Sequence, residues 1–255
     1  MELLYSLLLG LVQGLTEFLP VSSSGHLLLV GRIIGYKPTV AFEIVAHLGT
    51  LAAVAIAYRT RLKETVVRPL SKPSLVLVLS TAVTAVLVLL FEDTLRATFD
   101  GSLLPFAFAA TAVLIVLSSL VKPRAGREIG FFEGFIVGVS QAAAVVPGLS
   151  RSGTTISAAR FCGVDSEKSA DFSFMLSVPI IVVSALGELI RHFDEFAGQN
   201  ILCLAIVFFA SFVSGFFAIK LVMKAVRKGG FHIFAIYLGV LSVLLFLNDF
   251  FFHLI

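Results

Sequence analysis

Two short polar stretches stand out in this chain because both place chemically reactive side chains in an apolar setting. Residues 13–26 read QGLTEFLPVSSSGH, and residues 147–155 read PGLSRSGTT. A carboxylate, a histidine and an arginine are costly in contact with lipid, so such groups face a protein interior or a watery cavity and mark functional sites. The two stretches are therefore the candidate site.

The second stretch has the features of a phosphate-binding loop. Arg151 offers a fixed charge and a forked donor, and the neighbouring hydroxyls add further donors. A helix that restarts near Gly153 directs free N–H groups at an anion, and glycine lets the backbone approach closely. The expected substrate-binding residues here are Gly148, Ser150, Ser152 and Thr155. The alternative is that Arg151 only pairs with Glu17 and holds the two stretches together.

The first stretch supplies groups for acid–base and nucleophilic chemistry. If a helix restarts near Gly25, His26 follows Ser23 by three positions and reaches its hydroxyl, an arrangement that activates serine for attack on phosphorus or carbon. Glu17 precedes these residues by one turn, which Pro20 breaks. It is expected to orient the histidine, bind a cation or act as the base. The alternative for His26 is a hydrogen-bonded structural role. The expected substrate-binding residues of this stretch are Gln13, Ser22, Ser24 and Gly25.

A second pair of titratable residues follows the first stretch. Glu43 and His47 are four positions apart, so they share one face of a helix. They are expected either to support the residues of the site or bind a cation, or simply to form a hydrogen bond with each other.

The composition around these stretches is that of an integral membrane protein. Hydrophobic residues make up 58% of the 255 and charged residues only 14%, with a mean hydropathy of +1.03, whereas soluble domains carry roughly 25% charged residues. A bilayer core about 30 Å thick is crossed by around 20 helical residues. Near-uncharged runs of that length are 40–58, 74–91, 102–121, 172–190, 201–219 and 231–248.

The net charge of +3 is concentrated in short connectors, which indicates topology and excludes a nucleic-acid-binding surface. Connectors 59–73, 122–130 and 220–230 are rich in lysine and arginine and are expected to face the cytoplasm. Connectors 92–101 and 191–200 are poor in these residues and are expected outside. The six long runs fit this alternation.

Two segments remain, 1–36 and 131–165, and each has two apolar arms around a polar centre. Leu3 to Thr16 gives 14 uncharged residues, about 21 Å of helix, which is too short to span. A helix that breaks inside the membrane and leaves on the same side is tolerated where its broken backbone is buried in protein or lines a cavity. Both segments are therefore predicted to be broken re-entrant hairpins.

The second segment repeats the first at a constant offset of 128 residues. The matched pairs are Gly10 and Gly138, Gln13 and Gln141, Ser22 and Ser150, Ser24 and Ser152, Gly25 and Gly153, Arg32 and Arg160, and Gly35 and Gly163. Three spanning runs separate the segments, so the two repeats are inverted in the membrane and their tips are able to meet near mid-depth. The repeats cover approximately 1–121 and 129–252 of a single membrane domain, residues 1–255.

The predicted fold class is thus an all-α polytopic membrane protein. It has six spanning helices plus two broken re-entrant helical hairpins, arranged as an inverted-topology repeat.

The motifs resemble those of the undecaprenyl-diphosphate phosphatase family, also called the bacitracin-resistance protein family. The resemblance rests on Gln13-x-x-x-Glu17 with PVSSSGH, on PGLSRSGTT, and on FEIVAHLGT and FSFMLSVP after the two hairpins, and it covers essentially the whole chain. The family's (E/Q)xxxE motif falls on Gln13 and Glu17, and its serine-rich turn on Ser22 to His26. Its PGxSRSxxT motif falls on Pro147, Gly148, Ser150, Arg151, Ser152 and Thr155.

The resemblance implies hydrolysis of the terminal phosphate of a long-chain polyprenyl diphosphate, which recycles a lipid carrier for cell-envelope glycan synthesis. It also implies a divalent cation, Mg²⁺ or Ca²⁺, a homodimer, and a plasma-membrane location with the site open to the outer face. Gln13 stands where many members have glutamate, so Glu17 is the sole motif carboxylate and the expected metal residue.

In the expected reaction, Ser23 or a water activated by Glu17 attacks the terminal phosphorus. His26 passes the proton, and Arg151 stabilises the extra charge together with the metal.

Two rival functions are considered. The type-2 acid phosphatases also use a serine-glycine-histidine motif, but they require a histidine six residues after the arginine, where this chain has Ser157. A lipid flippase or secondary transporter is the stronger rival, because inverted repeats with broken helices are a general transporter plan.

Overall fold

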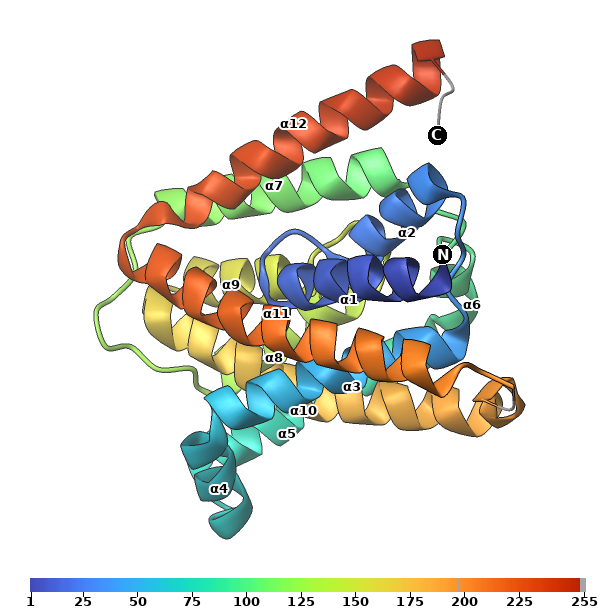
Figure 1. The fold of residues 1–255 in the computed structure, drawn as a ribbon. Coiled ribbons are helices and arrows are strands. Elements are labelled where there is room, and N and C mark those ends of the chain that lie inside the picture. Colours follow the sequence, from blue (N-terminus) through green and yellow to red (C-terminus); the bar gives the residue numbers. More distant parts are fainter. Residues whose placement is uncertain (197, 253–255) are drawn as a thin grey trace.

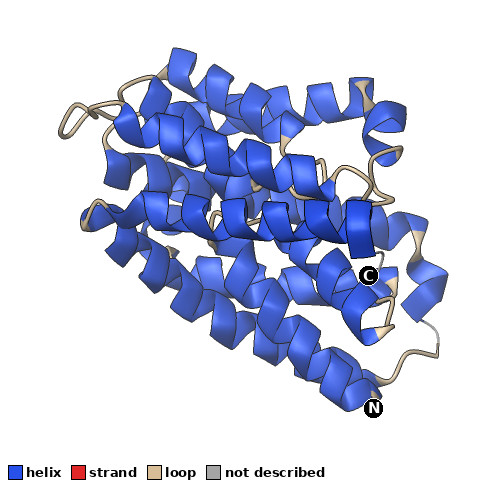
Figure 2. Cartoon of the chain, turned by 90° about the horizontal axis from the view of Figure 1, so that it is seen from above, coloured by secondary structure: helices blue, strands red, loops and turns tan. Residues whose placement is uncertain are grey.

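The computed structural model describes residues 1–196 and 198–252, and within them the chain is helical throughout, with loops only between helices (Figure 2). The helices are α1 (Glu2–Phe18), α2 (Ser23–Ile34), α3 (Val40–Ala57), α4 (Arg59–Val67), α5 (Lys72–Leu90), α6 (Glu92–Arg96), α7 (Leu104–Leu120), α8 (Phe131–Ala143), α9 (Arg151–Phe161), α10 (Ser166–Arg191), α11 (Ile201–Arg227) and α12 (Ile233–Leu247). Short turns η1 (Phe193–Phe196), η2 (Gly230–His232) and η3 (Asn248–Phe252) complete the described chain.

Five helical segments are long and apolar enough to cross a membrane, which confirms the polytopic membrane class. They are Val40–Ala57, Lys72–Leu90, Ser166–Arg191, Ile201–Arg227 and Gly230–Leu247. The sixth predicted span, 102–121, is helix α7 with 17 residues, and it belongs to the shorter apolar helices. Proline explains its length, because Pro105 lies in its first turn and Pro123 follows soon after its last residue.

The two segments predicted as broken hairpins are pairs of shorter helices, α1 with α2 and α8 with α9. The first break lies at Leu19 to Ser22, where Leu19 is extended, Pro20 cannot continue the helix, and Ser22 has φ 73°. The second break contains Pro147 and Gly148. Helix α1 is longer than the predicted arm, since it extends from Glu2 through Glu17 to Phe18.

Each of these pairs packs its first helix on a long helix from the other half of the chain. Helix α1 lies along α11, and α8 lies along α5 (Figure 1). Hydroxyls join both contacts: Ser211 donates to the carbonyl of Gly10 at 3.1 Å, and Thr84 donates to the carbonyl of Gly138 at 2.9 Å. The helices of the two halves are therefore interleaved, while the repeat boundaries near residues 121 and 129 remain a prediction.

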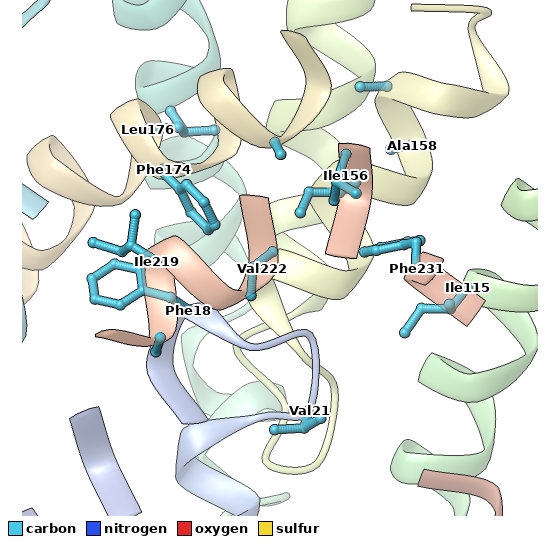
Figure 3. Packing of buried hydrophobic residues seen from close by; sticks show 14 of the residues in the cluster. Phe18, Val21, Ile115, Ile156, Ala158, Phe174, Leu176, Ile219, Val222 and Phe231 are labelled. Atoms are coloured by element: carbon cyan, nitrogen blue, oxygen red, sulfur yellow. The ribbon is translucent and has the colours of Figure 1, made fainter. Parts of the chain in front are cut away.

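An apolar core surrounds the two breaks and keeps their positions fixed. Phe18 and Phe174 are fully buried and meet edge to face with ring centroids 5.7 Å apart. Figure 3 shows them beside Ile219 of α11, with Val21 of the first break below. Fully burying such a side chain contributes about 1.5–3 kcal/mol, so this cluster stabilises the end of α1 where the polar residues begin.

Candidate active site

The tips of the two hairpins are in direct contact, as the inverted arrangement predicts. The hydroxyl of Ser22 accepts a hydrogen bond from the N–H of Gly148 at 3.1 Å. In the other direction, Ser152 donates its hydroxyl proton to the carbonyl of Leu19 at 3.0 Å. Each tip thus satisfies a backbone group that the break in the other tip leaves open, and the two stretches form one site.

Both tips restart their second helix with the same serine cap. Ser22 Oγ accepts from the N–H of Gly25 at 3.3 Å, and Ser150 Oγ accepts from the N–H of Gly153 at 3.1 Å. The helices therefore begin two residues earlier than the glycines suggested, at Ser23 and Arg151. Capping occupies the hydroxyls of Ser22 and Ser150, so their first role is to hold the backbone. Their predicted role in substrate binding is not visible in these contacts.

Two glycines allow the tips to approach closely. A Cβ on Gly25 would lie 2.7 Å from the ring of Phe108 and 3.0 Å from Cα of Gly148. Gly148 itself has φ 94°, and a Cβ there would lie 2.7 Å from that of Ala107. Both of these predicted site residues are placed at the junction, where only glycine fits.

Glu17 is the centre of the site. Its Oε2 atom accepts from Ser23 Oγ at 2.7 Å and from the side-chain amide of Gln13 at 3.1 Å, and its Oε1 accepts from Arg151 at 2.7 Å. Only 8% of the Glu17 side chain and 15% of the Arg151 side chain are exposed. A buried ion pair of this kind stays charged because each partner compensates the other.

Arg151 connects the Glu17 carboxylate to helix α10. One terminal nitrogen bonds Glu17, and the other donates to the carbonyl of Ser173 at 3.2 Å. Arginine has five N–H donors, so donors remain for a ligand. The ion pair between Arg151 and Glu17, which the structural alternative proposed, is therefore present. Arg151 nevertheless keeps free N–H donors that can bind an anion.

The predicted contact between His26 and Ser23 is wrong. Nδ1 of His26 lies 2.8 Å from the carbonyl of Ser22, and Nε2 lies 2.7 Å from the hydroxyl of Tyr237. The Ser23 hydroxyl donates to Glu17 instead. A carbonyl only accepts, so Nδ1 carries the proton of a neutral ring and Nε2 accepts from Tyr237.

The remaining predicted residues of the two tips divide by exposure. Ser24 is exposed and makes only a long 3.4 Å contact with Ser22 Oγ, so its hydroxyl is accessible to a ligand. Thr155 is buried and lies 2.7 Å from the hydroxyl of Ser173, so it holds the helix behind Arg151. Thr154, one of the neighbouring hydroxyls that were expected to add donors in the second stretch, has a buried hydroxyl without a partner among the described residues.

His47 lies beside the site and Glu43 does not join it. Nε2 of His47 is 3.9 Å from Glu17 Oε2, and its Nδ1 bonds the backbone carbonyl of Glu43 at 2.8 Å. The carboxylate of Glu43 is exposed and makes no described hydrogen bond with His47. His47 therefore fits the expected role of supporting the site. The alternative, a hydrogen bond between the side chains of Glu43 and His47, is not observed among the described contacts.

Three residues of the site lie outside both motifs and were missed. Tyr237 of α12 holds His26, Ser173 of α10 holds Arg151 and Thr155, and Thr111 of α7 accepts from the N–H of Ser150 at 3.1 Å. Ser173 lies within the FSFMLSVP stretch, which was a signal for its importance. Tyr237 and Thr111 lie in apolar runs with no such signal.

The donor set for a divalent cation is small. Within the described residues no group of three or more His, Cys, Asp and Glu side chains gathers around one point. The site does contain the Glu17 carboxylate and, next to it, a buried Oε1 of Gln13 without a hydrogen-bond partner. Mg²⁺ typically uses one or two carboxylates together with substrate phosphates, so these two residues fit a cation that binds with its substrate.

Comparisons with known proteins identify the family of the chain. A family model described as bacitracin resistance protein BacA matches residues 6–244. An undecaprenyl-diphosphatase of Carboxydothermus hydrogenoformans is 38% identical over 247 residues, which cover 93% of this chain and 94% of the relative. One of Treponema denticola is 35% identical over 254 residues, covering 93% and 94%. Undecaprenyl-diphosphatase 1 of Shouchella clausii is 37% identical over 269 residues, covering 97% and 96%.

Proposed function

The chain belongs to the bacitracin resistance protein BacA family, and we propose that it hydrolyses undecaprenyl diphosphate, or a similar long-chain polyprenyl diphosphate, to the monophosphate at the joined hairpin tips. The enzyme is a phosphoric anhydride hydrolase of the membrane. The observation that supports this site is the linked series in which Ser23 donates to Glu17 and Glu17 pairs with Arg151.

The diphosphate head group binds at the two helix starts. Arg151 contributes the N–H donors that Glu17 and Ser173 leave free. The exposed hydroxyl of Ser24 and the first N–H groups of α2 and α9 add to these donors. Preorganised donors of this kind stabilise charge that develops on the transferred phosphoryl group.

In the first step, the hydroxyl oxygen of Ser23 attacks the terminal phosphorus. Its proton passes to Glu17, which already accepts that hydrogen bond at 2.7 Å. The bond between the terminal phosphorus and the bridging oxygen breaks, and the polyprenyl monophosphate leaves as a dianion. The phosphate is then esterified to Ser23. Glu17, rather than His26, is the base for this step, because Ser23 donates to Glu17 and both ring nitrogens of His26 are bonded to other groups.

In the second step, water attacks the phosphorus of the Ser23 ester. The bond from phosphorus to the serine oxygen breaks, the proton held by Glu17 returns to that oxygen, and dihydrogen phosphate leaves with both protons of the water. His26 positions the tip, since both of its ring nitrogens are held by Ser22 and Tyr237. The alternative in which Glu17 activates water directly uses the same carboxylate without the ester.

A divalent cation, Mg²⁺ or Ca²⁺, belongs to this proposal. Glu17 and the free amide oxygen of Gln13 would hold it together with the substrate phosphates. Bound there, the cation supplies charge neutralisation for the diphosphate.

The site opens to the outer face of the plasma membrane in this proposal, and the protein is a homodimer. The lysine- and arginine-rich connectors 59–73, 122–130 and 220–230 support the orientation, because such connectors are expected on the cytoplasmic side.

The deciding experiment measures inorganic phosphate release from a long-chain polyprenyl diphosphate by purified protein in detergent, with and without a chelator. Release is expected to depend on the cation and to be lost in Arg151→Ala, Glu17→Gln and Ser23→Ala proteins. Detergent removes any gradient, so a flippase or secondary transporter predicts no release. A phosphoserine trapped in wild-type protein but not in Ser23→Ala distinguishes the ester from direct attack by water. Unchanged release in the Arg151→Ala protein would overturn the site.

A further inference from the structure

A cavity of about 820 Å³ lies away from the joined tips, between the end of α3, the start of α4 and the C-terminal half of α11. The C-terminal ends of α3 and α11 both lie on the left in Figure 1. The end of α3 adjoins connector 59–73, and the end of α11 lies in connector 220–230. Both connectors are rich in lysine and arginine and are expected at the cytoplasmic face. The cavity is therefore on the side opposite to the proposed outer opening of the active site.

Cationic side chains dominate the lining of this cavity. They are Arg59, Arg61, Lys220, Lys224, Arg227 and Lys228, with Asp171 as the only lining carboxylate among the described residues. Arg61 pairs with Asp171 at 2.7 Å, and Arg227 pairs with Glu167 at 2.9 Å. The other four cations have no acidic partner within 4.0 Å in the described part of the chain. Such an uncompensated concave surface attracts anions.

Apolar side chains complete the lining. Ile56, Phe216, Ile219 and Met223 contribute it, and Lys220 lies over the ring of Phe216 with its ammonium 4.2 Å from the centroid. Cations next to exposed apolar surface match an amphiphile whose charged head and apolar tail are joined.

The floor of the cavity is closed toward the active site. The hydroxyl of Tyr58 donates to Asp171 at 2.9 Å, and its ring packs against Phe174 with centroids 6.0 Å apart. Phe174 in turn packs on Phe18, the neighbour of Glu17 (Figure 3). Aromatic rings therefore separate the cavity from the catalytic carboxylate, and a ligand in the cavity is not the reacting one.

We propose that this cavity is a second binding site, for a phosphate-bearing anion, independent of the phosphate site at the tips. An anionic lipid head group and free inorganic phosphate share the chemistry that the cations recognise. The apolar lining suits the lipid, and the experiment separates the two.

The absence of tryptophan from the chain allows a specific fluorescent reporter. Phe216→Trp places one tryptophan in the cavity, and Ile56→Trp is a second reporter if the first does not fold. Each protein is reconstituted in zwitterionic vesicles that contain either brominated phosphatidylglycerol or brominated phosphatidylcholine at equal mole fraction. Bromine quenches nearby tryptophan. Phe209→Trp, on the same helix but outside the cavity lining and 62% exposed, is the control.

Stronger quenching by the anionic lipid is expected at position 216 and not at position 209. Lys224→Gln and Lys228→Gln should each reduce this preference by about fivefold, whereas Lys63→Gln, an exposed cation on α4 outside the cavity, should leave it unchanged. If millimolar inorganic phosphate restores the fluorescence, the free ion also occupies the site. If it does not, the occupant is the lipid. Equal quenching by both lipids, or equal loss in all three lysine variants, would overturn the proposal.

Discussion

The hydroxyl of Tyr237, in the last spanning helix, lies 2.7 Å from Nε2 of His26, in the first hairpin. The two rings also stack, with centroids 5.7 Å apart and planes inclined by 18°. The imidazole also meets the ring of Phe108 edge to face, with centroids 5.4 Å apart. The imidazole is thus fixed by groups from α7 and α12, so the orientation of the first tip depends on helices from both halves of the chain.

Tyr237→Phe is expected to slow phosphate release about fivefold, because a hydrogen bond of about 1 kcal/mol that orients His26 is removed. The ring remains, so the protein should fold normally. A steady-state assay in detergent tests this, with Tyr36→Phe, remote from His26, as the control. An unchanged rate would show that stacking alone holds the histidine.

Arg151→Gln is expected to lower the free energy of unfolding by about 3–5 kcal/mol, because the Glu17 carboxylate stays buried without its partner. The double change Glu17→Gln and Arg151→Gln removes both charges and should recover most of this stability while remaining inactive. Denaturant titration in detergent, together with the release assay, separates the two effects. A double variant as unstable as the single one would contradict the role assigned to the ion pair.

Neighbouring serines of the first tip should respond differently to alanine. Ser22→Ala is expected to lower the free energy of unfolding by about 1–2 kcal/mol, since it removes the cap of α2 and the acceptor for Gly148. Ser23→Ala should abolish release and also lower stability, by about 1.5–3 kcal/mol, because the buried Glu17 carboxylate loses a donor, and Ser24→Ala, at an exposed hydroxyl, should change both stability and release least. The three unfolding midpoints, compared with the three rates, test the assignment. Equal losses of stability would refute it.

Gly148→Ala is expected to destabilise the protein by about 1–3 kcal/mol, because a left-handed backbone is strained for alanine and its Cβ would meet Ala107. The matched control is Gly239→Ala in α12, where a Cβ meets nothing within 4 Å. That change should be neutral or stabilising by up to about 1 kcal/mol. Similar unfolding midpoints for the two variants would contradict the close packing of the tips.

Hydrophobic run length and the internal repeat were sufficient to predict the long apolar helices, the two breaks and the contact between the tips. The pairing of Glu17 with Arg151 was considered only as an alternative to phosphate binding by Arg151, because a metal could equally compensate the carboxylate at membrane depth. Prolines explain the shorter sixth span, and the helix α4 within connector 59–73 was not anticipated because its composition is polar.

The side-chain geometry inside the tips was less predictable. Ser23 and His26 have the spacing of a hydrogen-bonded pair on a helix, yet Glu17 accepts from the Ser23 hydroxyl and Tyr237 and the Ser22 carbonyl hold the imidazole. The roles of Tyr237 and Ser173 depend on packing between segments separated by 211 and 22 residues from their partners. Local spacing carries no information about such contacts.

The pairing of Glu17 with Arg151 spans 134 residues of chain, which has a consequence for biosynthesis. When α1 first enters the bilayer, the partner of its carboxylate has not yet been synthesised. The first hairpin is therefore incomplete until the second is inserted beside it. A ribosome that stalls between the two halves leaves an acid without its cationic partner in the membrane, where a charged side chain is costly.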